Sequence, residues 1–166
     1  MTAIVLGPAE LLSRALSDEI AGVTVVDVIS DAGATMWNAL VALQAARLAL
    51  TPPGGQIVVV LPTIGIAGSA GLVGYTTAVE GIRAMAKSAA RQWLSEGIRV
   101  NMVGAPVRIF APGLAGCDEH LTAAAVEDDS GLVHSVVATT KFLLRSDITH
   151  VVGETVIVDG GSVMLP

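Results

Sequence analysis

Charged residues are scarce in this chain. They make up 14% of its 166 residues, whereas ordinary soluble domains contain about 25%. The formal net charge is −6, and no stretch of the sequence gathers Lys and Arg into a cluster. Because binding to phosphates begins with a basic patch, the sequence excludes nucleic acid as a partner.

Long apolar runs and cysteine pairs are also missing. The longest candidate run, Thr35 to Leu50, is interrupted by Asn38, Gln44 and Arg47, so it falls short of the roughly 18 residues that suggest a membrane span. The single cysteine, Cys117, cannot form an internal disulfide. The N-terminus has no basic segment of the kind that starts a signal peptide. We therefore expect a cytoplasmic chain without membrane contact.

Apolar residues, in contrast, are abundant at 52% of the chain. A chain of this size needs polar residues to cover its surface, so we expect part of that surface to be buried against a partner. The alternative is that alanine, which is tolerated on surfaces, inflates the apolar count.

Short apolar segments alternate with helical patterns. The expected strands are Thr2–Leu6, Val23–Ile29, Gln56–Leu61, Arg99–Val103 and Thr155–Val158. The expected helices are Pro8–Ile20, Thr35–Leu50, Thr76–Ser95 and Leu132–Leu144, with a Gly-rich loop over residues 63–74. This alternation predicts one α/β domain over residues 1–166, a doubly wound parallel sheet of about five strands with helices on both faces.

Three stretches resemble the short-chain dehydrogenase/reductase (SDR) superfamily. AVEGIRAMAKSAARQWLSEGIRVN, Ala78 to Asn101, is similar to the helix and strand that follow the family's active-site Tyr-x-x-x-Lys. KFLLRSDITHVVGETVIVDGG, Lys141 to Gly161, resembles the family's C-terminal F-L-x-S-D and V-D-G-G motifs. GGQIVVVLP, residues 54–62, resembles the strand that carries the catalytic serine. DVISDAG, residues 27–33, resembles a degenerate form of the family's strand that ends in N-N-A-G.

The resemblance implies a truncated, Rossmann-like sheet. A complete SDR has two further strands between its first strand and the N-N-A-G strand. Here only about twenty residues separate Leu6 from Asp27, which leaves room for one helix. We therefore expect the strands on the cofactor side to be missing.

The resemblance also implies a reaction, hydride transfer between a nicotinamide and a carbonyl or alcohol carbon, with Tyr, Lys and Ser side chains at the centre. In this chain Pro62 stands at the serine position. Alignment without gaps places Leu72 and Thr76 at the tyrosine and lysine positions, whereas keeping the serine-to-tyrosine spacing gives Tyr75 and Val79. Neither register supplies a lysine. No catalytic residue is therefore predicted, and Tyr75 is the one residual candidate, with packing as its alternative role.

No cofactor or metal is expected. An SDR places a pyrophosphate over a turn with three spaced glycines, but here Gly7 leads through Pro8 directly to Glu10. Pro8 removes an N–H donor, and Glu10 adds negative charge. The three histidines lack the spacing of metal ligands.

The retained segments match those that SDR tetramers use for assembly. The implied partner is a full-length, active SDR subunit in a hetero-oligomer, most simply a tetramer. The expected interface residues are Trp37, Leu40, Leu43, Arg47, Val79, Arg83, Lys87, Trp93, Val163 and Met164.

The leading hypothesis is that the chain is not an enzyme on its own. It would be an inactive pseudoenzyme subunit that supports the oligomer or substrate pocket of an NAD(P)-dependent SDR, such as a hydroxyacyl-CoA-type dehydrogenase. Two alternatives remain open. One is a stand-alone, small-molecule-binding homo-oligomer that uses a pocket near Pro62, Tyr75 and residues 104–131. The other is a residual NAD(P)-dependent oxidoreductase.

Overall fold

The computed structural model describes residues 1–28, 30–50, 52–121 and 128–163. Within these residues the chain forms a parallel five-stranded sheet in the order β2-β1-β3-β4-β5. The strands are β1 (Thr2–Leu6), β2 (Val23–Val26), β3 (Gly55–Pro62), β4 (Ile98–Ala105) and β5 (Thr155–Ile157). The predicted Rossmann-like α/β sheet of about five strands is confirmed.

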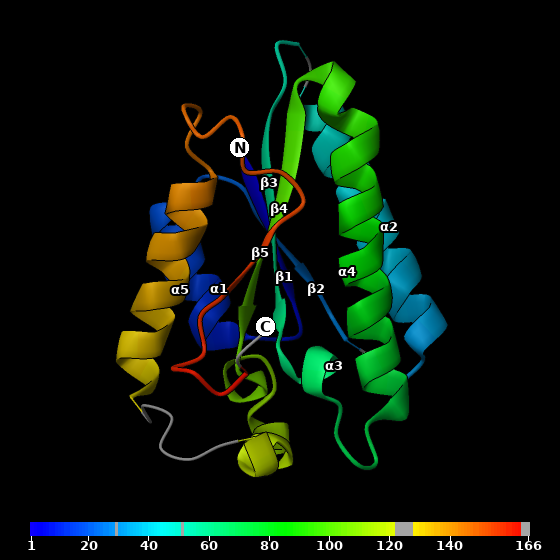
Figure 1. The fold of residues 1–166 in the computed structure, drawn as a ribbon, viewed down its shortest axis with the longest axis vertical. Coiled ribbons are helices and arrows are strands. Elements are labelled where there is room, and N and C mark those ends of the chain that lie inside the picture. The colour runs from blue at the N-terminus through cyan, green and yellow to red at the C-terminus, as the bar shows by residue number, and fades with distance from the viewer. Residues whose placement is uncertain (29, 51, 122–127, 164–166) are drawn as a thin grey trace.

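Helices cover both faces of the sheet (Figure 1). The long helices are α1 (Glu10–Glu19), α2 (Ala32–Ala49), α4 (Val73–Trp93) and α5 (Asp129–Leu143). Helices α1 and α5 pack on one face, and α2 and α4 pack on the other. The shorter elements are α3 (Ile64–Ala67) and the 3₁₀ segments η1 (Leu94–Glu96), η2 (Val107–Ile109) and η3 (Pro112–Leu121).

The core divides into two apolar layers because successive residues of a strand point to opposite faces. In β3, Val58 and Val60 pack with α1 and α5, whereas Ile57 and Val59 pack with α2 and α4. Strands covered on both faces contain apolar residues without interruption. This is why IVVVL in β3 has no polar residue.

The strand order is that of a flavodoxin-like doubly wound sheet rather than the 3-2-1-4-5-6 order of dinucleotide-binding folds. In the latter, the fourth strand separates the first from the fifth. Here β1 pairs directly with β3, and β2, which leads into the segment that resembles N-N-A-G, lies outside β1. The burial pattern agrees with this placement, because β1 is almost wholly buried whereas Thr24 and Val25 of the edge strand β2 are exposed.

Three helices, α2, α4 and α5, begin three residues earlier than their apolar patterns predict. Helix α2 begins at Ala32 because Asp31 caps it, with the Asp31 Oδ1 accepting a hydrogen bond from the Ala34 N–H at 3.0 Å. Helix α4 begins at Val73, inside the segment predicted as a Gly-rich loop. No helix in the described part of the chain combines the length and the apolar character needed to cross a bilayer.

Candidate functional site

The carboxyl ends of the parallel strands meet at one edge of the sheet, at the bottom of Figure 1, beside α3 and η3. Ligands of open α/β sheets bind at this edge, where the strand order reverses. In this chain the reversal lies between β1 and β3. A ligand site is therefore expected at the β1–α1 turn and at the end of β3.

The chain itself uses the backbone donors of the β1–α1 turn. The Gly7 N–H donates to the Val26 carbonyl at 2.8 Å, and the Ala9 N–H donates to the Phe110 carbonyl at 3.2 Å. Pro8 has no N–H. The main chain of Phe110 lies so close that a Cβ added at Gly7 would be 3.2 Å from its carbonyl oxygen.

This turn does not fit the pyrophosphate of a dinucleotide. Such a phosphate needs exposed N–H groups at the turn and at the helix N-terminus. Here the carbonyl oxygen of Phe110 already accepts from the turn, and Glu10 places a carboxylate in the first turn of α1. Sequence reasoning identified Pro8 and Glu10 but could not identify Phe110, which lies far along the chain.

A cavity of about 560 Å³ adjoins this turn and is lined in part by Pro8, Glu10, Arg108 and Asp129. The Arg108 Nε donates to Asp129 Oδ1 at 2.7 Å, so the cation faces a carboxylate of its own chain. The remaining Glu10 carboxylate makes the cavity unfavourable for an anionic ligand.

Pro62, the residue expected at the serine position, ends β3, and the next residue, Thr63, carries a hydroxyl that sequence reasoning missed. Thr63 is buried, and both its N–H and its Oγ1 donate to the Ala105 carbonyl, at 2.8 Å and 3.3 Å. This pair of bonds ties the end of β3 to the end of β4. The Thr63 hydroxyl therefore has a structural role. Its position next to Pro62 is the sequence feature that could have identified it.

Tyr75 lies in the first turn of α4 and packs against the apolar layer formed by α2 and α4. Its hydroxyl is buried and has no hydrogen-bond partner among the described residues. Burial raises the pKa of Tyr75 to about 12, so the phenol stays protonated at neutral pH. The Tyr75 hydroxyl thus keeps its proton and makes no hydrogen bond with the described residues.

The other residues that the two alignments place at the tyrosine and lysine positions provide no available polar group beside Tyr75. Val79, one turn further along α4, is buried in the core. The Thr76 hydroxyl donates to the Leu72 carbonyl at 2.9 Å, within the start of its own helix. Among the residues that the structure describes, no group of His, Cys, Asp and Glu is placed to hold a metal.

Three of the expected interface residues have side chains in the core. Leu43, Val79 and Trp93 are all buried in the layer between the sheet and helices α2 and α4. Their apolar character reflects packing within the chain, so they are removed from the expected set. Periodicity cannot separate a helix face that meets the sheet from one that meets a partner.

Two expected cations make ion pairs within the chain. Arg47 donates from Nε to Glu96 Oε2 at 2.8 Å, and its guanidinium lies 5.5 Å from the centre of the Trp93 ring. This ion pair and hydrogen bond lower the pKa of Glu96 and raise the pKa of Arg47. Arg83 pairs with Glu80 one turn earlier on α4. Lys87 is exposed.

The remaining expected residues differ in exposure. Trp37 is 65% exposed on α2, and Leu40 is half-buried. Val163 is half-buried, and its N–H donates to the Asp159 carboxylate at 2.6 Å. Met164 lies outside the described residues.

Trp37 belongs to an apolar stripe on the outer side of α2. Val41 is 52% exposed and Leu48 is 74% exposed. These three residues, at positions i, i+4 and i+11, fall on one side of a helix. The opposite side of α2, with Ala39 and Leu43, is buried against the sheet. We call Trp37, Val41 and Leu48 the α2 stripe.

Comparisons with known proteins agree with the motifs. A family model described as enoyl-(acyl carrier protein) reductase matches residues 26–163. A 3-oxoacyl-[acyl-carrier-protein] reductase of Vibrio cholerae is 26% identical, over 94% of this chain and 73% of that protein. Carbonyl reductase family member 4 of Danio rerio is 28% identical, over 84% of this chain and 58% of its own length.

A solved structure shares the fold. The structure of a Sinorhizobium meliloti protein, described with the short-chain alcohol dehydrogenases, superposes with a TM-score of 0.59 at 20% identity. The match covers 76% of this chain and 52% of the other. The chain thus spans only part of the length of its relatives.

The prediction that the chain is not an enzyme on its own is wrong. Its relatives are named as reductases, which points to an oxidoreductase. The prediction rested on the residues at Pro62, Leu72 and Thr76, on the absence of a lysine in either register, and on the loss of the Gly-rich turn and of the strands on the cofactor side.

The motifs of the sequence, the parallel sheet and the family model point to the same conclusion. The chain belongs to the short-chain dehydrogenase/reductase superfamily, in the family described as enoyl-(acyl carrier protein) reductase.

Proposed function

We propose that this chain is a subunit of an SDR-type oxidoreductase and assembles with a full-length SDR chain through the outer side of α2. The observation that carries the proposal is the α2 stripe, in which Trp37, Val41 and Leu48 are each at least half exposed. A cytoplasmic location and a tetrameric assembly are parts of the same proposal.

The stripe supports an interface because its residues share one side of one helix. Single exposed apolar residues are ordinary, whereas apolar residues that share one surface are more typical of contact sites; Trp37 and Val41 are neighbours on α2, and the exposed Gln44 separates Val41 from Leu48. Trp is also among the residues that contribute most to binding when an interface covers them. The low charge content of the chain agrees, since interface centres are depleted of charged residues.

The names of the relatives suggest a substrate class. The Vibrio cholerae relative is named as a 3-oxoacyl-[acyl-carrier-protein] reductase. A 3-oxoacyl thioester and the corresponding 3-hydroxyacyl thioester differ by one hydride and one proton. This pair is therefore the first substrate to test, and it includes the hydroxyacyl-CoA chemistry expected from the sequence.

Co-expression with full-length SDR chains tests the assembly. The wild-type chain is expected to form a complex of defined mass with one of them, measured by light scattering after size-exclusion chromatography. Trp37→Lys or Leu48→Lys is expected to weaken that complex by about tenfold or more, since each places a charge in a desolvated contact. Val73→Lys is the matched control, because Val73 is 75% exposed on α4, outside the stripe.

Two results would contradict the assembly. A stable homo-oligomer or monomer that ignores every SDR chain would favour the stand-alone binding protein instead. Equal loss of the complex with Val73→Lys would show that added charge, rather than the stripe, controls association.

A further inference from the structure

Strand β2 forms one edge of the sheet and, in the described part of the chain, pairs with β1 alone. The Gly7 N–H of the β1 end donates to the Val26 carbonyl at 2.8 Å, so the backbone groups of Val26 point towards β1. Because backbone groups alternate between the two sides of a parallel strand, those of Val23 and Val25 point away from β1. These outward N–H and C=O groups are free to pair with another strand.

The sequence of β2 favours pairing with another strand. The strand reads Val-Thr-Val-Val, and such β-branched residues are typical of strands. Natural sheets protect their edges with Lys, Pro, bulges or very short strands, and β2 contains neither Lys nor Pro. Its protection is its length of four residues. A contact through this edge is therefore expected to be weak and to dissociate on dilution.

A hollow of about 300 Å³ lies along this edge, between β2 and α1. Two residues of β2 and four residues of α1 line it, namely Val23, Val25, Glu10, Ser13, Arg14 and Ser17. We call it the β2–α1 hollow. The side chain of Val25 is 42% exposed there. A strand that adds beside β2 would place its own side chains over this hollow and cover Val25.

Two residues of opposite charge lie at this edge. Arg14 is exposed on α1 and lines the β2–α1 hollow, and Asp27 is exposed directly after β2. Neither side chain makes an ion pair or a hydrogen bond with the residues that the structure describes. Val26 and Val28 pack on the face of the sheet that α2 and α4 cover. Because successive side chains alternate, Asp27 lies on the other face, which is the face of α1.

We propose that β2 pairs in antiparallel orientation with β2 of a second copy of this chain, so that the two sheets become continuous. In the register that places Val25 opposite Val25, the residue opposite Asp27 is Val23 of the second copy. That Val23 lines the same hollow as Arg14, so Asp27 of one copy meets Arg14 of the other. A two-fold axis repeats every contact, and both charges on both copies gain a partner.

Other strands fit this edge less well. A basic segment would pair with Asp27 but would be repelled by Arg14. An acidic segment would pair with Arg14 but would be repelled by Asp27 and by Glu10, the carboxylate of the hollow. A second copy supplies one carboxylate and one guanidinium where each has a counterpart. The antiparallel register also keeps like charges from lying directly opposite each other, which would destabilise the pair.

Analytical ultracentrifugation of the purified chain over a range of concentrations tests the pairing. The wild-type chain is expected to pass from monomer to dimer as its concentration rises. Val25→Pro removes an N–H that points away from β1, so it should leave the β1–β2 pairing intact. It should weaken the dimer by about tenfold or more, because the two-fold axis doubles the loss. Val25→Thr is the matched control, since it keeps the N–H and a β-branched side chain, and it should dimerise nearly as the wild type does.

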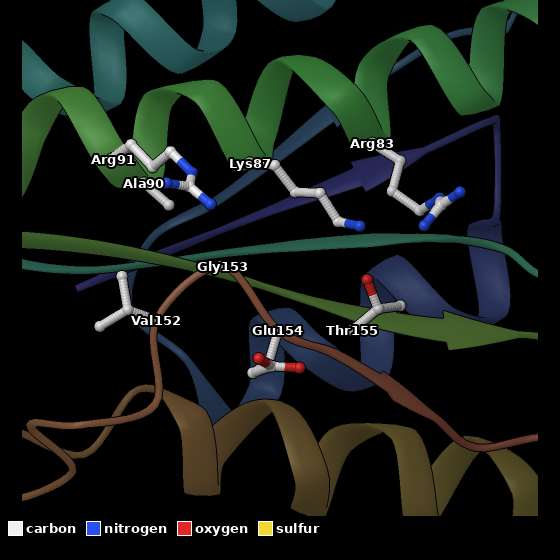
Figure 2. A pocket seen from close by; sticks show the side chains of 8 residues that line it. All are labelled: Arg83, Lys87, Ala90, Arg91, Val152, Gly153, Glu154 and Thr155. Atoms are coloured by element: carbon white, nitrogen blue, oxygen red, sulfur yellow. The ribbon is translucent and has the colours of Figure 1, made fainter. Parts of the chain in front are cut away.

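Exchange of the two charges tests the register. Arg14→Asp and Asp27→Arg are each expected to weaken the dimer by about tenfold, since each places like charges together in both copies. The double variant should recover most of the lost affinity. Both positions are exposed, so folding should be unaffected. Lys87→Glu is the matched charge control and should leave the dimer unchanged. Figure 2 shows Lys87 extending from α4 into a groove of about 410 Å³ beside the segment Val152 to Thr155, away from α1 and β2.

Several results would overturn the proposal. They are a monomer at every concentration, a dimer that Val25→Pro leaves intact or that Val25→Thr weakens equally, and a double charge exchange that fails to restore association. Equal weakening by Lys87→Glu, or by Trp37→Lys in the α2 stripe, would also overturn it, because the contact would then lie on another surface. The assay uses the chain without any SDR partner, so its failure leaves the proposed assembly through the α2 stripe untouched.

Discussion

Tyr75 shows how burial changes the chemistry of a single side chain. The resemblance to the SDRs implies a lysine near the tyrosine that lowers the pKa of the tyrosine. Here Val79 is one turn away, and the apolar surroundings raise the pKa of Tyr75 to about 12. The residue therefore acts as a proton donor or as a packing residue, and not as a base near neutral pH.

The raised pKa of Tyr75 predicts a loss of stability at alkaline pH. Between about pH 10 and pH 12 the native state keeps a proton that the unfolded state releases, so the free energy of unfolding falls as the pH rises, by about 2–3 kcal/mol in total. This contribution is fully present below about pH 10. Tyr75→Phe removes this pH dependence and, by removing an unpaired buried hydroxyl, should leave stability unchanged or higher by about 1 kcal/mol at neutral pH.

Urea unfolding of both proteins at neutral and alkaline pH measures this effect. Tyr75 is the only tyrosine of the chain, so the near-ultraviolet absorbance of the phenolate reports its pKa directly. A measured value near that of free tyrosine would show that water reaches the hydroxyl.

Val79 stands at the family's lysine position in one of the two alignments, so Val79→Lys measures the cost in stability of restoring a lysine there. Val79→Lys would place an ammonium in the core between α4 and the sheet, where Val79 is fully buried. We expect a loss of several kcal/mol in the free energy of unfolding, about 3 or more, or an introduced amine that stays neutral. Chemical denaturation measures the loss. Val73→Lys, on the exposed start of the same helix, should change stability by less than about 0.5 kcal/mol.

At the scale of elements, α2 depends on its N-terminal cap. Asp31 Oδ1 accepts from the Ala34 N–H at 3.0 Å, which satisfies one of the free donors of the first turn. Asp31→Ala is expected to lower the free energy of unfolding by about 1 kcal/mol, whereas Asp31→Asn should cost much less because Asn caps equally well. Urea unfolding of both variants gives the comparison. Equal losses would indicate that the charge of Asp31, rather than its hydrogen bond, stabilises the helix.

The two sides of helix α4 have different surroundings. Its buried side, which includes Val79, Ile82 and Ala86, packs against the sheet, and the cations Arg83, Lys87 and Arg91 line a groove beside residues 152–155. The spacing of those cations is visible in the sequence. What faces them is not, because Glu154 and Thr155 lie some sixty residues further on.

At the scale of the whole molecule, the strand order predicts where the sheet opens first. Strand β3 lies between β1 and β4 and is buried on both faces, whereas β2 and β5 form the edges. Native-state hydrogen exchange should therefore be slowest in β3 and faster in β2 and β5, by about tenfold or more. Equal protection in β2 and β3 would mean that the edge does not open separately from the rest of the molecule.

Much of the fold follows from local patterns. The continuous apolar runs IVVVL and TAIVL predict buried parallel strands, and the alternation of strands and helices predicts the doubly wound sheet. The start of α4 could not be placed from its apolar pattern, because Val73 and its neighbours have no apolar periodicity of their own. The interface residues were harder to predict from the sequence than the start of α4. Leu43 and Trp37 look alike in the sequence, yet one is buried and the other is 65% exposed.

The sequence by itself determined the fold class and the superfamily, because these depend on local periodicity and on motifs that are contiguous in the chain. Only the tertiary structure decided which strand lies at the edge, that Phe110 closes the β1–α1 turn, and that α4 shares a groove with residues 152–155. Each of these joins segments far apart in the chain, and long-range packing depends on how whole elements share the core rather than on any one pattern.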